Sequence, residues 1–128
     1  MDFSIRRLDH VVLRVADLER AIAFYRDVLG CQEERRVESI SLVQMRAGES
    51  LIDLILAPAQ PDAEGGNMDH FALRIDPFDE GALRRHLEAR GVEVGEVASR
   101  YGAEGEGPSI YIKDPDGNTV ELKGPPAA

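Results

Sequence analysis

The chain has 128 residues, enough for one globular domain with a shared hydrophobic core. Its 24 acidic and 15 basic residues give a formal net charge of -9, which argues against nucleic acid or an anionic membrane surface as the main partner. The sequence has no apolar run long enough to span a membrane and no basic-then-apolar signal pattern, and we therefore expect a cytoplasmic protein. Cys31 is the only cysteine, which excludes an internal disulfide and a multi-cysteine zinc site.

The first half of the chain predicts a strand, a helix and three more strands. Residues 8–15 are rich in Val and Leu, and residues 18–29 carry apolar side chains at helical spacing. Asp17 is a suitable N-cap for this helix, and Gly30 is a suitable stop. Three strand candidates follow, at residues 33–38, 41–47 and 50–57.

The second half predicts the same order of elements. A strand at 68–75 precedes a helix at 78–90, and three strand candidates follow near residues 92–98, 109–113 and 118–123. Residues 99–107 are the least regular segment, and we expect a loop that either covers a site or lies on the surface. In the run 114–118, Pro115 and Gly117 predict a tight turn that closes a hairpin.

These elements form one module that is written twice. The run LDHVVLRVADLERAIAFYRDVLG, from residue 8, matches MDHFALRIDPFDEGALRRHLEARG, from residue 68, so that His10 falls on His70. The later run SLVQMRAGESLIDL matches SIYIKDPDGNTVEL, and Asp53 falls on Glu121. The sequence therefore predicts an α+β fold in a single domain, residues 1–128, made of two tandem βαβββ modules. Their expected bounds are 5–57 and 68–124, with a linker at 58–67 and a disordered tail at 125–128.

Strand periodicity places the four repeat-related polar residues on one kind of face. Side chains two residues apart share a face of a strand, so His10, Asp53, His70 and Glu121 all point away from the apolar faces that pack against the helices. If the sheet curls, this polar face is concave and the four side chains can converge. Two imidazoles and two carboxylates without a thiolate suit one divalent ion, such as Ni, Zn, Mn, Co or Fe(II).

Register predicts the neighbours of the two carboxylates. If Lys113 pairs with Thr119 across the turn, Tyr111 lies opposite Glu121, with Ser109 and Lys123 on the same face. The repeat then places Val43 opposite Asp53, flanked by Met45, Leu51 and Ile55, which predicts one polar and one apolar half of the site.

Four further side chains are candidates for roles in the site. Tyr111 is either a proton donor and orienter or a packed tyrosine with a solvated hydroxyl. Arg14 and Arg74 share the histidine face, where they either hold an anionic substrate group or are solvated. Lys113, expected near Tyr111 and Glu121, is a third candidate for binding substrate.

The chain resembles the vicinal oxygen chelate superfamily, which includes glyoxalase I, methylmalonyl-CoA epimerase, extradiol dioxygenases and fosfomycin resistance proteins. Three runs carry the resemblance: LDHVVLRVADLERAIAFYRDVLG, MDHFALRI and IYIKDPDGNTVEL. It implies two βαβββ modules that form a cupped mixed sheet, with the helices on the outer face and one divalent metal ion that chelates adjacent substrate oxygens. The resemblance implies that the metal ligands are His10, His70, Glu121 and Asp53. It also implies a homodimer, because modules from two chains complete the cup in many members.

Within the superfamily, the opening run most resembles glyoxalase I, in which the position of Arg14 contacts glutathione. The chain departs from that enzyme at two contacts, because Asp53 replaces a glutamate and Ala57 replaces a polar glutathione contact. Residues 104–108 also lack the basic residue that often meets the carboxylate of the thiol. These departures do not favour glutathione as the cosubstrate.

The resemblance implies a metal-dependent lyase or isomerase of glyoxalase type, which acts on a small oxygen-chelating substrate through an enediolate. Glu121, with Asp53 if it reaches, would move the proton. One alternative is an extradiol-type Fe(II) dioxygenase that uses His10, His70 and Glu121, with Tyr111 beside them. A second is a non-catalytic drug-binding protein of the bleomycin-resistance type.

Overall fold

A computed structural model describes residues 7–57, 68 and 70–127 of the chain. The chain divides into two compact units, Met1–Pro61 and Asp62–Ala128, and each is described by itself. The linker expected at 58–67 lies outside the described residues. Within the described part of the chain, no helix is long and apolar enough to cross a membrane.

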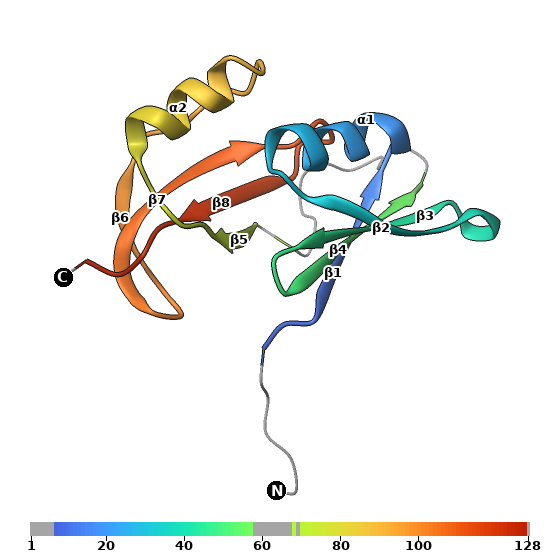
Figure 1. Cartoon of the computed structure of the whole chain (residues 1–128), viewed down its shortest axis with the longest axis horizontal. Helices are drawn as coiled ribbons and strands as arrows, with labels where there is room; N and C mark the ends of the chain where they lie inside the picture. Colours follow the sequence, from blue (N-terminus) through green and yellow to red (C-terminus); the bar gives the residue numbers. More distant parts are fainter. Residues whose placement is uncertain (1–6, 58–67, 69, 128) are drawn as a thin grey trace, which may run out of the picture. The chain divides into compact units, whose positions relative to one another are not determined.

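The first unit is a four-stranded mixed sheet with one helical segment (Figure 1). Its strands lie in the order β1-β4-β3-β2, with β1 parallel to β4 and the other neighbours antiparallel. The elements in chain order are β1 (His10–Val15), α1 (Leu18–Ala23), the π-helical turn η1 (Phe24–Val28), β2 (Gln32–Val37), the 3-10 turn η2 (Glu38–Ile40), β3 (Leu42–Ala47) and β4 (Ser50–Leu56).

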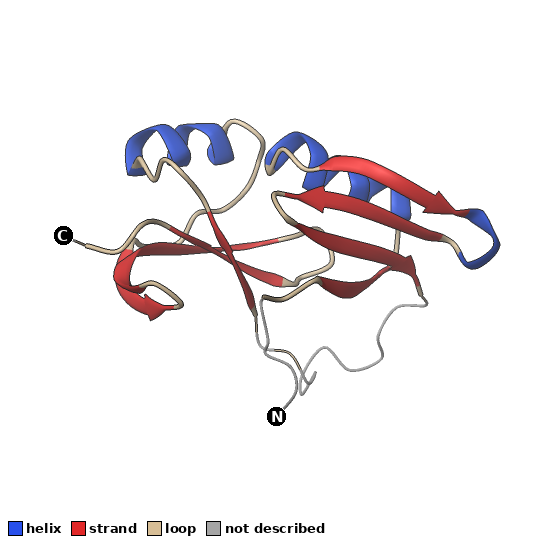
Figure 2. Ribbon diagram, turned by 60° about the horizontal axis from the view of Figure 1, so that its bottom comes forward, coloured by secondary structure: helices blue, strands red, loops and turns tan. Residues whose placement is uncertain are grey.

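The helical segment is fixed at both ends by the residues that the sequence predicts. The Asp17 carboxylate accepts a hydrogen bond from the Arg20 backbone N–H at 3.0 Å, which satisfies a donor that the helix start would leave free. Gly30, with φ of 77°, ends the segment in the left-handed region. The predicted helix at 18–29 is therefore α1 continued by η1. Figure 2 shows this segment lying across one face of the sheet.

Alternation along the strands separates the core of the first unit from its polar face. The core lies between the helical segment and the sheet, and it contains the fully buried side chains Leu13, Val15, Ala21, Ile22, Tyr25, Val43, Met45, Ile52 and Leu54. Full burial of an aliphatic side chain of this size stabilises the fold by about 1.5–3 kcal/mol. The opposite face carries His10, Arg14, Gln44 and Asp53.

The second unit repeats this topology with the strand order β5-β8-β7-β6, in which β5 is parallel to β8. Its helix begins after Asp79, whose carboxylate accepts from the Ala82 N–H at 3.1 Å. The elements are β5 (Phe71–Arg74), α2 (Glu80–Glu88), β6 (Ala98–Gly102), β7 (Gly105–Lys113) and β8 (Thr119–Lys123). The predicted α+β fold with two βαβββ modules is confirmed.

The register of the parallel pairs matches the sequence repeat residue for residue. Val12 pairs with Asp53 in the first unit, and Ala72 pairs with Glu121 in the second. These are the partners that the alignment of His10 with His70 and of Asp53 with Glu121 requires. The repeat is therefore a repeat of strand pairing as well as of sequence.

The prediction of a loop at 99–107 is wrong, because these residues belong to the hairpin of β6 and β7. Gly102 pairs with Gly105, so the glycines close a two-residue turn instead of interrupting strands. The strand predicted at 92–98 starts only at Ala98, and the preceding residues touch β7 through a hydrogen bond from the Gly95 N–H to the Tyr111 carbonyl at 3.2 Å.

The chain beyond β8 returns along the same hairpin. A Cβ at Gly107 would stand 2.4 Å from the Pro125 carbonyl oxygen, so this close approach requires glycine. The Ala127 N–H donates to the Glu106 carbonyl at 2.8 Å. Residues 125–127 therefore lie against β7.

The predicted turn between β7 and β8 is confirmed and is organised by a buried aspartate. Asp114 Oδ1 accepts from the backbone N–H groups of Asp116 at 2.9 Å and Asn118 at 2.8 Å. Asp114 Oδ2 accepts from the Asn118 side-chain amide at 2.8 Å, and Gly117 has a φ of 82°. One carboxylate thus holds the turn that sets the register of β8.

We expect Asp114→Ala to lower the free energy of unfolding by about 2–4 kcal/mol, because three donors lose a charged acceptor at a buried position. Glu49→Ala, in the exposed turn of the matching first-unit hairpin, is the control and should change it by less than about 0.5 kcal/mol. Denaturant unfolding measures both. Equal effects of the two substitutions would contradict the role given to Asp114.

Candidate functional site

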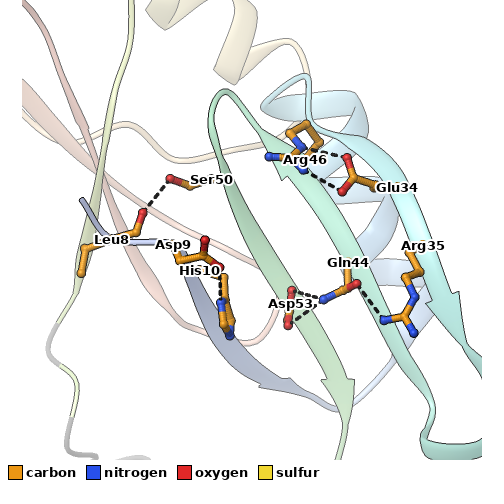
Figure 3. Close-up of polar contacts among 9 residues, drawn as sticks. All are labelled: Leu8, Asp9, His10, Glu34, Arg35, Gln44, Arg46, Ser50 and Asp53. Carbon is orange, nitrogen blue, oxygen red and sulfur yellow. Dashed lines mark hydrogen bonds and ion pairs between the residues drawn. The ribbon is translucent and has the colours of Figure 1, made fainter. Parts of the chain in front are cut away.

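His10 and Asp53 lie on neighbouring strands of the first unit, on the face away from the helical segment (Figure 3). His10 Nδ1 lies 2.8 Å from Asp9 Oδ2. The hydrogen bond to Asp9, and then the negative charge of Asp53, raise the pKa of His10. A neutral ring that donates from Nδ1 keeps the lone pair of Nε2 for a ligand, which is the arrangement found around metal-bound histidines.

Asp53 is buried, with 5% of its surface exposed, and its partner is an amide. Gln44 Nε2 donates toward both carboxylate oxygens, at 3.3 Å from Oδ1 and 3.2 Å from Oδ2. The Gln44 carbonyl oxygen in turn accepts from Arg35 Nη1 at 3.3 Å. Figure 3 shows the resulting series of side chains, which crosses β2, β3 and β4 from Arg35 to Asp53.

The sequence repeat predicted Val43 opposite Asp53, and this prediction is wrong because Gln44 occupies that position. The hairpin spans 9 residues from Gln44 to Asp53 (53 minus 44) but 10 from Tyr111 to Glu121 (121 minus 111), so an ungapped alignment is shifted by one residue in β3. A shift of one residue moves side chains to the opposite face of a sheet. Val43 and Met45 therefore lie in the core, and the first-unit site is more polar than predicted.

His70 and Glu121 form the matching pair in the second unit. His70 Nε2 lies 3.1 Å from Glu121 Oε1, and Glu121 has 6% of its surface exposed. Tyr111 pairs with Glu121 across β7 and β8, as predicted, and Lys113 pairs with Thr119. The Tyr111 ring meets the His70 ring edge to face, with centroids 5.2 Å apart. Tyr111 thus packs against the imidazole and restricts its orientation.

The donor chemistry of both pairs fits a divalent cation. Imidazole nitrogen and carboxylate oxygen are ligand atoms for zinc and similar divalent ions. His70 Nε2 and Glu121 Oε1 are in hydrogen-bond contact at 3.1 Å, so two such atoms already lie together in the second unit. Within the described ranges, no group of three or more His, Cys, Asp or Glu side chains forms a cation site by itself. Each unit has one histidine and one carboxylate on the same face of its sheet.

The three cationic side chains expected to bind substrate have different surroundings. Arg14 lies exposed on β1, on the His10 face. Arg74 Nε forms an ion pair with Glu104 Oε1 at 3.0 Å. Lys113 donates to the Thr119 hydroxyl beside the turn.

Sequence reasoning missed Gln44 and Arg100. Gln44 was missed because of the one-residue shift in register, and Arg100 because its strand was predicted as a loop. The Arg100 guanidinium carbon stands 4.3 Å from the centroid of the Tyr111 ring, and Nη1 donates to the Ser109 carbonyl at 2.9 Å and hydroxyl at 2.8 Å. Arg100 pairs with Gly107 across the hairpin, and Ala98 pairs with Ser109. Because side chains alternate along a strand, this pairing places Arg100 on the face that carries Ser109 and Tyr111.

Cys31 is buried, and burial raises the pKa of its thiol to about 11. The thiol is therefore protonated at neutral pH, which argues against a nucleophilic thiolate.

A model of the Glyoxalase/Bleomycin resistance protein/Dioxygenase superfamily matches residues 7–122, and the chain belongs to this superfamily. The resemblance drawn from the repeated runs is thereby confirmed. Both halves of the chain, and all four of His10, Asp53, His70 and Glu121, fall within the matched region.

Relatives of known class cover most of the chain. It is 35% identical over 127 residues to lactoylglutathione lyase of Salmonella typhimurium, covering 91% of this chain and 90% of that protein. It is 30% identical to mitochondrial methylmalonyl-CoA epimerase of Mus musculus, covering 94% of this chain and 74% of that protein. The solved structure of virulence protein STM3117 from Salmonella typhimurium has 29% identity and a TM-score of 0.76, over 96% of this chain and 99% of that one. The named relatives thus include a lyase and an epimerase.

We expect Gln44→Leu to lower the free energy of unfolding by about 1–3 kcal/mol, because the buried Asp53 carboxylate loses its amide donor. The double variant Gln44→Leu/Asp53→Leu should recover most of this loss, since no buried carboxylate then remains unpaired. Arg35→Met, which removes an exposed cation, is the control and should have little effect. Equal free energies of unfolding for Gln44→Leu and the native chain would contradict the role of Gln44 as the hydrogen-bond donor to Asp53.

Proposed function

We propose that this protein is a divalent-metal-dependent lyase or isomerase that moves a proton on a small substrate with two neighbouring oxygens. One observation carries the proposal: two histidine and carboxylate pairs stand at equivalent positions of two equivalent sheets, and both carboxylates are buried. The lyase and the epimerase among the relatives support this class over oxygen insertion and over simple sequestration.

His10 and Asp53 of a first module, with His70 and Glu121 of a second, would hold the ion. The two modules would come from one chain or from two, and a homodimer would allow the second arrangement. With imidazole and carboxylate donors and no thiolate, the set suits Zn, Ni, Co, Mn or Fe(II). When bound, such an ion supplies Lewis acidity, which stabilises negative charge on the substrate oxygens.

The side chains of the protein would supply the proton transfer. Glu121 is the proposed base, because its carboxylate faces the site and is largely screened from water. His70 holds one of its oxygens, and Tyr111 packs against His70. Asp53 is the second candidate, and Gln44 orients it with a hydrogen bond toward each oxygen. Arg14, Arg74 and Lys113 would attract the charged part of a substrate.

The test is exchange of carbon-bound protons for deuterium, followed by NMR on a panel of 2-hydroxy carbonyl compounds. We expect the metal-loaded protein to catalyse exchange on at least one of them and Glu121→Gln to reduce its rate by about 100-fold or more, because the base is removed while the fold remains. Glu96→Gln, at an exposed position, is the matched control and should keep the native rate.

Three outcomes would count against the proposal. Full exchange activity in Glu121→Gln would exclude this carboxylate as the base. Oxygen consumption with catechols by the Fe(II)-loaded protein would favour the dioxygenase alternative. Failure to bind any of the five metals would favour a non-catalytic binding protein.

A further inference from the structure

We propose that Lys123 and Arg100 form an oxyanion-binding subsite on the second sheet, which takes a carboxylate or phosphoryl group of the substrate. The inference rests on the proposed function, since it names the class of molecule that the site accepts: a small carbonyl compound with an anionic group.

Lys123 is the last residue of β8 and shares the face of Glu121, two residues before it on the strand. It has only 8% of its surface exposed. A Cβ at Gly102 would stand 2.6 Å from Lys123 Cε, and a Cβ at Gly107 would stand 3.2 Å from Nζ. The lysine side chain therefore lies against bare backbone of β6 and β7, where glycines leave room for it.

The Lys123 side chain is mostly buried, its nitrogen keeps some contact with solvent, and it has no anionic partner among the described residues. Among the residues that the structure describes, none forms a hydrogen bond or an ion pair with Lys123 Nζ, and Arg74, the residue that pairs with Lys123 across β5 and β8, takes the carboxylate of Glu104. A charge on a side chain that is mostly withdrawn from water gains more from a counter-charge than a charge in open solvent does. An anionic ligand would supply it.

Arg100 brings a second cation to the same place. Its Nη1 is bound to the carbonyl and hydroxyl of Ser109, the residue that pairs with Lys123 across β7 and β8. The ring of Tyr111 supports the guanidinium from one side. Arg100 is thus held in a fixed position on the face that carries Lys123, and its remaining N–H groups suit a two-oxygen anion.

The charge balance of this face supports the assignment. It carries four cations, Arg74, Arg100, Lys113 and Lys123, and two carboxylates, Glu104 and Glu121. A cationic face is unexpected in a chain with a net charge of -9. Positions two apart on a strand are separated by about 7 Å. The anionic group of the substrate would therefore lie within a few bonds of the carbon from which Glu121 would take the proton.

The chain has two lysines, Lys113 and Lys123, which makes their amines easy to observe. Reductive methylation with a carbon-13 label keeps the charge and gives each lysine an NMR signal, which Lys123→Met assigns. Inorganic phosphate and malonate are titrated separately, with the protein as purified and after treatment with a chelator. The chelator separates binding at Lys123 from binding to a metal ion.

We expect a saturable shift of the Lys123 signal that persists after chelation. Lys123→Met keeps most of the side-chain length but not the charge, and it should weaken anion binding by at least about tenfold. Arg100→Met should have the same effect. Binding to both variants is followed on backbone amide signals. Lys123→Arg should retain it. Arg85→Met, which removes an exposed helix cation, is the control and should bind as the native chain does. The tighter of the two anions identifies the substrate group as phosphoryl or carboxylate.

The inference is overturned if neither anion shifts the Lys123 signal, if Lys123→Met binds both anions as tightly as the native chain, or if all binding is lost with the metal. These results would leave the proposed function intact, because exchange activity and its loss in Glu121→Gln do not depend on them. Conversely, anion binding at Lys123 in a protein without exchange activity would overturn the proposed function and keep the subsite.

Discussion

The parallel pairing of the first and last strands of each module is the constraint on which the site depends. It places Asp53 beside Val12 and Glu121 beside Ala72, two residues along from His10 and His70. Since side chains alternate, this register puts each histidine and its carboxylate on the face opposite the core. A slip of one residue would bury the histidine among apolar side chains and turn the carboxylate away from it.

The two carboxylates are equivalent in position but differ in their partners. Asp53 is held by the neutral amide of Gln44, whereas Glu121 is held by the imidazole of His70. An amide fixes a carboxylate without exchanging protons with it. This difference between the two modules favours Glu121 over Asp53 for the proton transfer that we propose.

Much of the fold follows from local signals in the sequence. Asp17, Gly30 and Gly117 mark ends and turns through their own side chain or backbone angles, and the prediction was right at all three. Strand alternation also placed Tyr111 opposite Glu121. Two predictions failed for non-local reasons. The partner of Asp53 depends on how many residues each hairpin contains, and the β6–β7 hairpin depends on pairing between glycine-rich segments that have little intrinsic strand preference.

We propose, as the central claim, that the two modules share one ion through four side chains. X-ray absorption at the metal edge, on protein loaded with zinc or nickel, tests it most directly. The account predicts one ion for each chain, with two imidazole ligands, oxygen ligands and no sulfur, and the loss of one imidazole in each of His10→Gln and His70→Gln. An ion whose ligands are unchanged when either histidine is replaced would contradict the account.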